Sequence, residues 1–253
     1  MRLATYNFQL GGRRDGARHW QRLEAELEPD IIFAQEANRP PGHSPRARGG
    51  RTVWRRISER AWGSAIVVRG RIIEELTFEA HSGWLAGCVA ELEDGFVVSA
   101  VSLHAPMVQG QNYAALLSGV VGQISRLQLD APLVLGGDFN VKSAGPRAVT
   151  EEITPNVADQ AIMARVSAEL GLVSCWEAAH PGVDLPQTLR WSRSPEVPYH
   201  SDAIFVDARW KVRSCEVVRD GHWPAMSDHF PVVADVQPPV EKRAPARASR
   251  ARS

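Results

Sequence analysis

The stretch PLVLGGDFN at residues 132–140 places a short apolar run directly before two glycines and two polar side chains, Asp138 and Asn140. The run is too short for a helix and does not alternate with polar residues, so it predicts a strand covered on both faces. Taken alone, Asp138 and Asn140 after the two glycines are more simply explained by a turn in which the aspartate bonds to nearby backbone. A functional interpretation therefore needs the rest of the chain.

Apolar runs of the same kind recur along the chain, most of them rich in β-branched or aromatic residues and closed by turn residues. We expect strands at residues 3–8, 30–35, 64–68, 84–92, 96–103, 132–135, 203–206 and 231–236. Apolar residues at helical spacing predict helices at 17–27, 111–129 and about 157–170. Strands interleaved with a few amphipathic helices indicate an α+β protein in which two packed sheets carry helices on their outer faces.

Two basic segments stand out from this pattern. Residues 39–60 carry seven Arg against one acid, together with Pro and Gly, and are expected to form a long exposed loop. Residues 240–253 carry five basic residues against one acid and follow Pro238-Pro239. We expect one catalytic domain at 1–237 and a disordered basic tail at 238–253.

Composition excludes several classes of protein. The 29 basic and 29 acidic residues cancel, so net charge gives no argument for binding to nucleic acid or membrane. Three widely spaced cysteines without a CxxC pair speak against a disulfide framework or a structural zinc site and favour a reducing compartment. No run approaches the ~18 apolar residues of a membrane span, and the first residues lack the apolar region of a signal peptide. A cytoplasmic protein is expected.

Polar side chains capable of binding a cation or moving a proton occur at the ends of the expected strands. Each has an ordinary structural explanation: Glu36 as a solvated strand end, His104 as a hydrogen-bonded structural histidine, Asp228-His229 as a turn with a capping aspartate. Together they form an ordered series, which independent turns need not produce. The series is Asn7, Glu36, His104, Asp138, Asn140, Asp202, Asp228 and His229.

The motifs that contain these residues are TYN (5–7), QE (35–36), SLHAP (102–106), GGDFN (136–140), SDAIF (201–205) and SDHFP (227–231). In this order they resemble the endonuclease/exonuclease/phosphatase (deoxyribonuclease I-like) superfamily over roughly residues 3–236. GDFN and SDHFP are the most specific parts. The resemblance implies a four-layer αββα sandwich of two mainly antiparallel sheets with outer helices, in agreement with the pattern of elements.

The resemblance also implies the reaction, hydrolysis of a phosphoric ester by water with the help of a divalent cation. Mg²⁺ suits this role because it binds one or two carboxylates and keeps several waters, and Mn²⁺ is a possible substitute. By resemblance, Glu36 is the principal ligand, Asn7 lies beside the cation directly or through water, and Asp228 reaches the same cation or a second one.

The remaining residues receive proton-transfer and binding roles by the same resemblance. His229 is the favoured base, since the ordinary pKa of imidazole is near neutrality, and Asp202 fixes its tautomer. Asp138 orients the water and is the competing base. Asn140 donates to the phosphate, and His104 contacts it or protonates the leaving oxygen. His200 would share a side with Asp202 if that strand is regular.

The substrate class stays open at this point. The basic segment 39–60 with Trp54 follows Glu36 directly and combines cations with an aromatic ring, which favours a nucleic acid. The alternative is a phosphatase or phosphodiesterase for a small phosphorylated metabolite or lipid headgroup. We expect a monomer.

Overall fold

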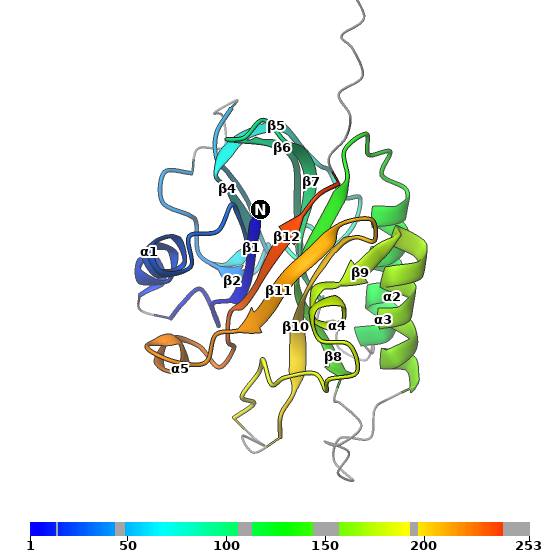
Figure 1. Ribbon diagram of the computed structural model, residues 1–253. Coiled ribbons are helices and arrows are strands. Elements are labelled where there is room, and N and C mark those ends of the chain that lie inside the picture. The colour runs from blue at the N-terminus through cyan, green and yellow to red at the C-terminus, as the bar shows by residue number, and fades with distance from the viewer. Residues whose placement is uncertain (14, 44–48, 106–112, 144–156, 193–196, 240–253) are drawn as a thin grey trace, which may run out of the picture.

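The computed structural model describes residues 1–13, 15–43, 49–105, 113–143, 157–192 and 197–239. Its strands form two six-stranded sheets that pack face to face (Figure 1). The first sheet contains, in spatial order, β11 (Lys211–Val217), β12 (Val232–Gln237), β1 (Arg2–Asn7), β2 (Ile31–Ala37), β4 (Gly63–Val68) and β3 (Thr52–Arg56). The second contains β5 (Gly70–Glu75), β6 (Leu85–Leu92), β7 (Val97–His104), β8 (Leu133–Ser143), β10 (His200–Asp207) and β9 (Leu172–Ser174).

Each sheet holds one parallel pair of strands at its centre, and its other neighbours are antiparallel. The parallel pairs are β1 with β2 and β7 with β8. A parallel pair needs a crossover, and here α1 (Gly16–Leu27) and α2 (Tyr113–Ser125) lie between the paired strands in sequence. The carboxyl ends of all four strands lie at one edge of the sandwich, where Asn7 bonds to Asp138 and His104 approaches Glu36 across the two sheets.

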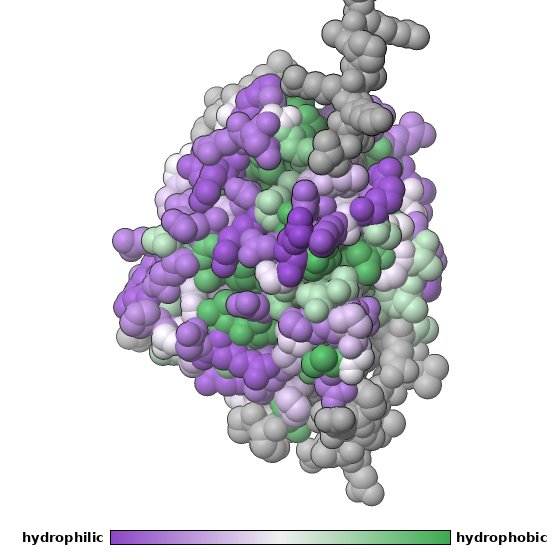
Figure 2. All heavy atoms as spheres, in the orientation of Figure 1, coloured by the Kyte–Doolittle hydropathy of each residue, from purple (hydrophilic) through white to green (hydrophobic). Residues whose placement is uncertain are grey.

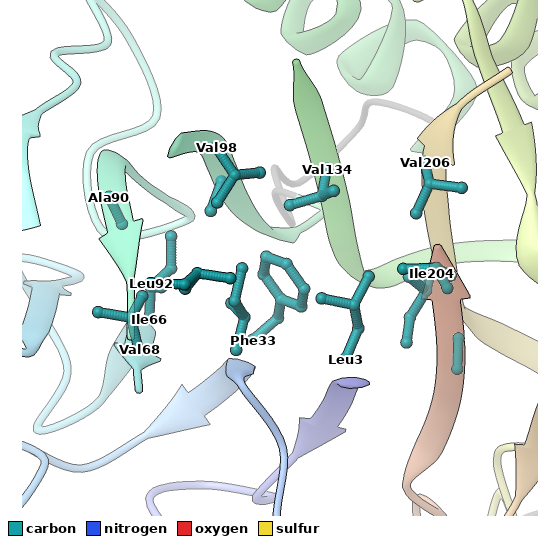
Figure 3. Close-up of a cluster of buried hydrophobic side chains, with 14 of the residues drawn as sticks. Leu3, Phe33, Ile66, Val68, Ala90, Leu92, Val98, Val134, Ile204 and Val206 are labelled. Atoms are coloured by element: carbon teal, nitrogen blue, oxygen red, sulfur yellow. The ribbon is translucent and has the colours of Figure 1, made fainter. Parts of the chain in front are cut away.

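Apolar side chains fill the space between the sheets, as the close-up in Figure 3 shows. Leu3 and Phe33 project from the first sheet toward Val98 and Val134 of the second. These side chains are fully buried. The contact explains why the strands that carry them read as continuous apolar runs, since their other faces are covered as well.

Helices form the outer two layers. On the first sheet, Trp20, Leu23 and Leu27 recur at helical spacing along α1 and pack against strand residues such as Ile32. On the second sheet, α2 and α3 (Val157–Leu170) lie together, and Leu117 packs in the same cluster as strand residues of β7 and β8. Two short helices, α4 (Cys175–Ala179) and α5 (Trp223–Met226), complete the described elements. The expected α+β sandwich of four layers is confirmed.

The surface has the character expected of such a domain. On the face shown in Figure 2, hydrophilic residues predominate and hydrophobic ones appear in separate patches. Within the part of the chain that the structure describes, no helix is long and apolar enough to cross a membrane.

The basic segment 39–60 differs from its expected form as a long exposed loop. Residues 52–56 form the edge strand β3, which pairs with β4 from Thr52 to Arg56. Val53 is buried between the sheets, and this single apolar anchor in a basic segment was too weak a signal to predict a strand. The expected tail lies outside the described residues from position 240 onward.

Candidate active site

Strand register brings the predicted polar residues to one edge of the sandwich. Asn7 pairs with Gln35 across the parallel strands of the first sheet, directly before Glu36. In the second sheet His104 pairs with Asp138, and Asp138 in turn pairs with Asp202 on β10. The two sheets thus contribute neighbouring rows of polar side chains.

Asp202 and His229 form a buried pair of a carboxylate and an imidazole at this edge. His229 Nδ1 lies 2.9 and 3.1 Å from the two oxygens of Asp202. Because a carboxylate only accepts hydrogen bonds, Nδ1 donates, and Nε2 is directed toward Asp138 Oδ2 at 3.8 Å. Ser201 Oγ also donates to Asp202 Oδ2 at 3.0 Å. Asp202 therefore fixes both the tautomer and the direction of the His229 ring.

Asp138 connects the two sheets through hydrogen bonds. Asn7 Nδ2 donates to its Oδ2 at 3.0 Å, from the first sheet. Asn140 donates to Oδ1 from its backbone N at 2.9 Å and to Oδ2 from its side chain at 3.3 Å. Asn140 adopts a left-handed backbone with φ of 51°, which is uncommon outside glycine and is typical of a position held by its surroundings. The carboxylate is consequently held in one orientation.

Glu36 reaches the site because its strand is irregular. The pairing of β2 with β4 shifts register between Ala34 and Ala37, and Glu36 has a positive φ of 46°. This bulge turns its carboxylate to the end of the strand, where Leu10 N donates to Oε2 at 2.5 Å. Burial raises the pKa of Glu36, the Leu10 N–H and the charge of His229 lower it, and the charge of Asp228 raises it by a smaller amount.

Asp228 and Asn7 lie close to this carboxylate. Gln9 Nε2 donates to Asp228 Oδ2 at 2.7 Å, and Asp228 Oδ1 is 4.0 Å from His229 Nε2. The amide oxygen of Asn7 accepts from Gln9 N at 2.9 Å, so the Asn7 side chain offers its NH₂ group to the carboxylates. The loop after β1 therefore organises the acidic groups of the first sheet.

His104 completes the site between Glu36 and Asp138. Its Nε2 lies 3.7 Å from Glu36 Oε1 and 3.9 Å from Asp138 Oδ2, whereas its buried Nδ1 has no hydrogen-bond partner among the described residues. Burial lowers the pKa of His104 to about 4. The ring is therefore neutral near pH 7, and the two facing carboxylates favour the tautomer with its hydrogen on Nε2.

Burial and neighbouring charges shift the pKa values of His104 and His229 in opposite directions. Burial alone would lower the pKa of His229, but the charges of Asp202 and Asp138 outweigh it and raise that pKa to about 10. Burial raises the pKa of Asp138 to about 6 against the opposing effect of His229. The pKa of His104 is thus lowered and that of His229 raised, and pKa shifts in opposite directions in neighbouring groups are typical of acid–base sites.

All eight predicted site residues thus lie at this edge. His200 does not join them: β10 shifts register between His200 and Asp202, and the His200 ring donates from Nδ1 to Pro186 O at 2.7 Å. The strand is not regular, so the condition under which the two side chains were expected to share a side is not met.

Sequence reasoning also missed supporting residues. Ser227 Oγ donates to Asn7 O at 2.8 Å and accepts from His229 N at 3.1 Å, which ties the SDHFP loop to the end of β1. Thr188 Oγ1 accepts from the backbone N of Ser201 and of Asp202. Ser227 stands inside a motif and could have been found there, but nothing in the sequence around Thr188 distinguishes it from other loop threonines.

Two sets of residues have donor atoms suited to a cation. Asp138, Asp202 and His229 form the group of acidic and imidazole ligands that the described residues bring within 4.8 Å of one another. Glu36 and Asp228 form a second, more accessible set of carboxylates. Both lie in the same site.

A cavity of about 710 Å³ elsewhere in the molecule shares no residue with the site. It is lined by Val97 and Pro132, which lie at the amino ends of β7 and β8, whereas the site lies at their carboxyl ends. This cavity therefore lies at the opposite end of the central strands from the site.

An αββα sandwich with convergent carboxylates and imidazoles at the carboxyl ends of its central strands defines a class of hydrolases of phosphoric esters. The chain belongs to the Endonuclease/Exonuclease/phosphatase family, whose model matches residues 4–229. The family assignment from sequence is confirmed, and the protein is an enzyme that hydrolyses phosphoester bonds. No curated protein sequence matches the chain closely enough to count as a relative.

Solved structures share the fold at low sequence identity. A family protein from Leptotrichia buccalis is 17% identical with a TM-score of 0.62, over 94% of this chain and 99% of that one. The 3′ phosphatase NExo from Neisseria, solved with a product DNA hairpin, is 20% identical with a TM-score of 0.69 over 93% and 98%. An AP endonuclease from Archaeoglobus fulgidus is 19% identical with a TM-score of 0.65, also over 93% and 98%.

Proposed function

We propose that the protein is a divalent-metal-dependent nuclease that hydrolyses phosphodiester bonds of DNA or RNA by in-line attack of water. The observation that carries this proposal is the convergence of Asp138, Asp202 and His229 with His104 and Glu36 at one edge of the sandwich. The likeness of the fold to a DNA phosphatase and an AP endonuclease supports a nucleic acid as substrate.

Glu36 and Asp228 are the residues we assign to the cation. Burial is the main cause of the raised pKa of Glu36, and Asp228 adds to it, although Leu10 N–H and the charge of His229 lower it. A bound cation would stabilise the ionised form of this buried carboxylate, whose neighbouring imidazole is that of the neutral His104. Asn7 is assigned a place beside the cation through water, because its amide oxygen already accepts from Gln9 N. Mg²⁺, or Mn²⁺ in its place, supplies polarisation of the phosphate and stabilisation of the leaving oxygen.

The Asp138, Asp202 and His229 cluster has a different role in this proposal. Both oxygens of Asp202 already accept from His229 Nδ1, which is the arrangement of a carboxylate that stabilises an imidazolium rather than of a metal ligand set. His229 Nε2 and Asp138 Oδ2, 3.8 Å apart, hold the attacking water between them. The raised pKa of His229, about 10, keeps its ring protonated near pH 7, so the proton of the water passes first to the Asp138 carboxylate. The titration of the two groups is shared rather than a property of either residue alone.

His104 positions the phosphate, and Asn140 positions Asp138 of the Asp138–His229 pair. Neutral His104 donates from Nε2 to a phosphoryl oxygen, where negative charge increases in the transition state. Asn140 orients Asp138 through its backbone and side-chain hydrogen bonds. Preorganised donors of this kind require no rearrangement during the reaction.

Basic and aromatic residues near Glu36 support a nucleic acid over a small metabolite. The Arg39 guanidinium lies 5.3 Å from the Trp54 ring centroid, and that of Arg60 lies 5.7 Å from the Trp62 ring centroid. Trp54 Nε1 donates to Ala37 O, which places it next to the end of β2. Cations interleaved with aromatic rings suit a chain of phosphates and bases.

A substrate panel tests the proposal. With Mg²⁺ present, we expect hydrolysis of plasmid DNA, single-stranded DNA, RNA or an abasic-site duplex to exceed that of inositol phosphates. The His229→Asn variant, purified identically, controls for contaminating nucleases. Binding to DNA should weaken steeply as salt rises. Hydrolysis restricted to inositol phosphates, without salt-dependent DNA binding, would establish the small-metabolite alternative.

A further inference from the structure

Two tryptophans join the two sheets directly beside His104. Trp62 precedes β4 in the first sheet, and Trp84 precedes β6 in the second. The Trp84 ring centroid lies 4.8 Å from that of His104, and the Trp62 centroid lies 6.0 Å from His104 and 6.3 Å from Trp84. A cluster of aromatic rings therefore extends from the imidazole that we assign to the phosphate.

The backbone around Trp84 is fixed from both sheets. Ser64 Oγ and His104 N both donate to Trp84 O, each at 2.9 Å. The preceding Gly83 has a positive φ of 85°, and a Cβ there would lie 2.4 Å from Ile57 N, so the loop packs tightly on the end of the β3 segment. A loop held this firmly loses little backbone entropy when a ligand binds to it.

Exposure distinguishes the two rings. Trp62 is almost fully buried at 8% exposure, whereas Trp84 remains partly exposed. Arg60, on the Trp62 side, is exposed and places its guanidinium over the Trp62 ring. The aromatic cluster that contains His104 thus includes a partly exposed ring, Trp84, and carries an exposed positive charge over Trp62.

We propose that Trp84 and Arg60 form the subsite for the nucleotide joined to the scissile phosphate. The base stacks on the accessible part of the Trp84 ring, and Arg60 contacts the next phosphate along the chain. This inference rests on the proposed nuclease function and specifies its substrate. A base within a duplex is already stacked on its neighbours, so the subsite favours single-stranded or frayed nucleic acid.

The test uses single-stranded oligonucleotides with one ordinary phosphodiester linkage among phosphorothioates. One version carries bases on both flanking nucleotides, and two others carry a tetrahydrofuran residue on one side or the other. Removing the base on the Trp84 side should raise the KM of the wild-type enzyme about tenfold, the effect of one aromatic–base stack. Removing the base on the other side should change KM less.

The variants separate stacking from packing. Trp84→Leu should raise KM about tenfold on the intact oligonucleotide and show no further loss when the base is removed. Trp84→Phe, which keeps a ring, should retain most of the affinity. Trp176→Leu, at a half-buried tryptophan whose ring centroid lies 4.1 Å from that of His180, is the matched control and should leave KM as in wild type. Arg60→Gln should reduce the salt dependence of binding by about one phosphate contact.

Two outcomes overturn the subsite. One is a wild-type KM that is the same with and without either base. The other is a Trp84→Leu variant that loses kcat equally on every oligonucleotide, because that result assigns Trp84 to the packing of His104 alone. Neither outcome contradicts nuclease activity as such, whereas a wild-type enzyme that hydrolyses none of the oligonucleotides contradicts the proposed function itself.

Discussion

Asp138 on β8 and Asp202 on β10 lie directly opposite each other in an antiparallel pair, and both are essentially inaccessible to solvent. Two buried carboxylates at neighbouring positions repel each other unless a positive charge lies between them. His229 contacts Asp202 at 2.9 Å and approaches Asp138 at 3.8 Å. The imidazole of His229 therefore offsets the negative charge of the two carboxylates, in addition to its proposed role in the reaction.

The Asp202→Asn variant tests the first half of this arrangement. Asparagine keeps the size of the side chain but removes the charge that stabilises the protonated ring and fixes its tautomer. We expect kcat to fall by about 10² to 10⁴, with circular dichroism unchanged. Ser201→Ala, which removes only a hydrogen bond to the same carboxylate, should stay within a few-fold of wild type. Similar losses in both variants would mean that the carboxylate acts through packing.

Asp138 and His229 should behave as one functional unit. Because both contact the same attacking water in our proposal, Asp138→Asn and His229→Asn should each lower kcat by about 10² to 10⁴. The double variant should lose little more than the worse single variant, since removing either residue disables the pair. Losses in kcat that multiply in the double variant would show that the two residues act in separate steps. A near-wild-type kcat in either single variant would remove that residue from the mechanism.

Removal of divalent cations should abolish activity without unfolding the protein. EDTA treatment is expected to stop hydrolysis, and added Mg²⁺ or Mn²⁺ to restore it. Glu36→Gln removes one negative ligand and should raise the metal concentration needed for half-maximal rate, whereas Glu26→Gln, in an exposed ion pair on α1, should not. Full activity after thorough chelation would contradict the metal assignment.

Much of this site could be predicted because its residues occur in short motifs at strand ends. GGDFN and SDHFP identify Asp138 and His229 in the sequence, and the packing of the two sheets brings His229 Nε2 to 3.8 Å from Asp138 Oδ2. The fold was also predictable from local patterns, since buried strands covered on both faces appear in the sequence as apolar runs.

The rest depended on features that no local pattern encodes. The bulge that turns Glu36 into the site arises from pairing with β4, and the register shift that separates His200 from Asp202 arises from pairing with β8. Gln9 reaches Asp228 across 219 positions of sequence. Long-range register of this kind is set by the assembled sheets, so it becomes visible only in the structure.

His19 should make stability depend on pH. Its ring stacks on Tyr6 and Phe8, and burial lowers its pKa to about 4. The folded state therefore binds this proton less readily than the unfolded state, whose histidine titrates near 6.5. The free energy of unfolding should fall as pH decreases from about 6.5 to about 4, by at most about 3 kcal/mol, and should lose nothing further from this group below pH 4.

Urea unfolding of matched histidine variants isolates this effect. The decline in unfolding free energy between pH 6.5 and 4 should be smaller in His19→Gln than in wild type, although the variant is less stable overall. His222→Gln, at an exposed position, should keep the wild-type decline. An identical decline in all three proteins would assign the pH dependence to other groups.

The spacing of β7 and β8 should control both stability and catalysis, because these strands carry His104 and Asp138. A Cβ at Gly137 would lie 1.9 Å from Leu103 O, so Gly137→Ala must separate the parallel strands next to the site. We expect a loss of about 1–3 kcal/mol in unfolding free energy and a lower kcat, because the separation moves Asp138 relative to His104. Gly119→Ala is the matched substitution on α2, where a Cβ meets nothing within 4 Å, and it should add about 0.5–1 kcal/mol with activity unchanged. If the unfolding free energy and kcat of Gly137→Ala both equal those of wild type, the strands can adjust without moving His104 and Asp138. The rigid placement argued for the site is then wrong.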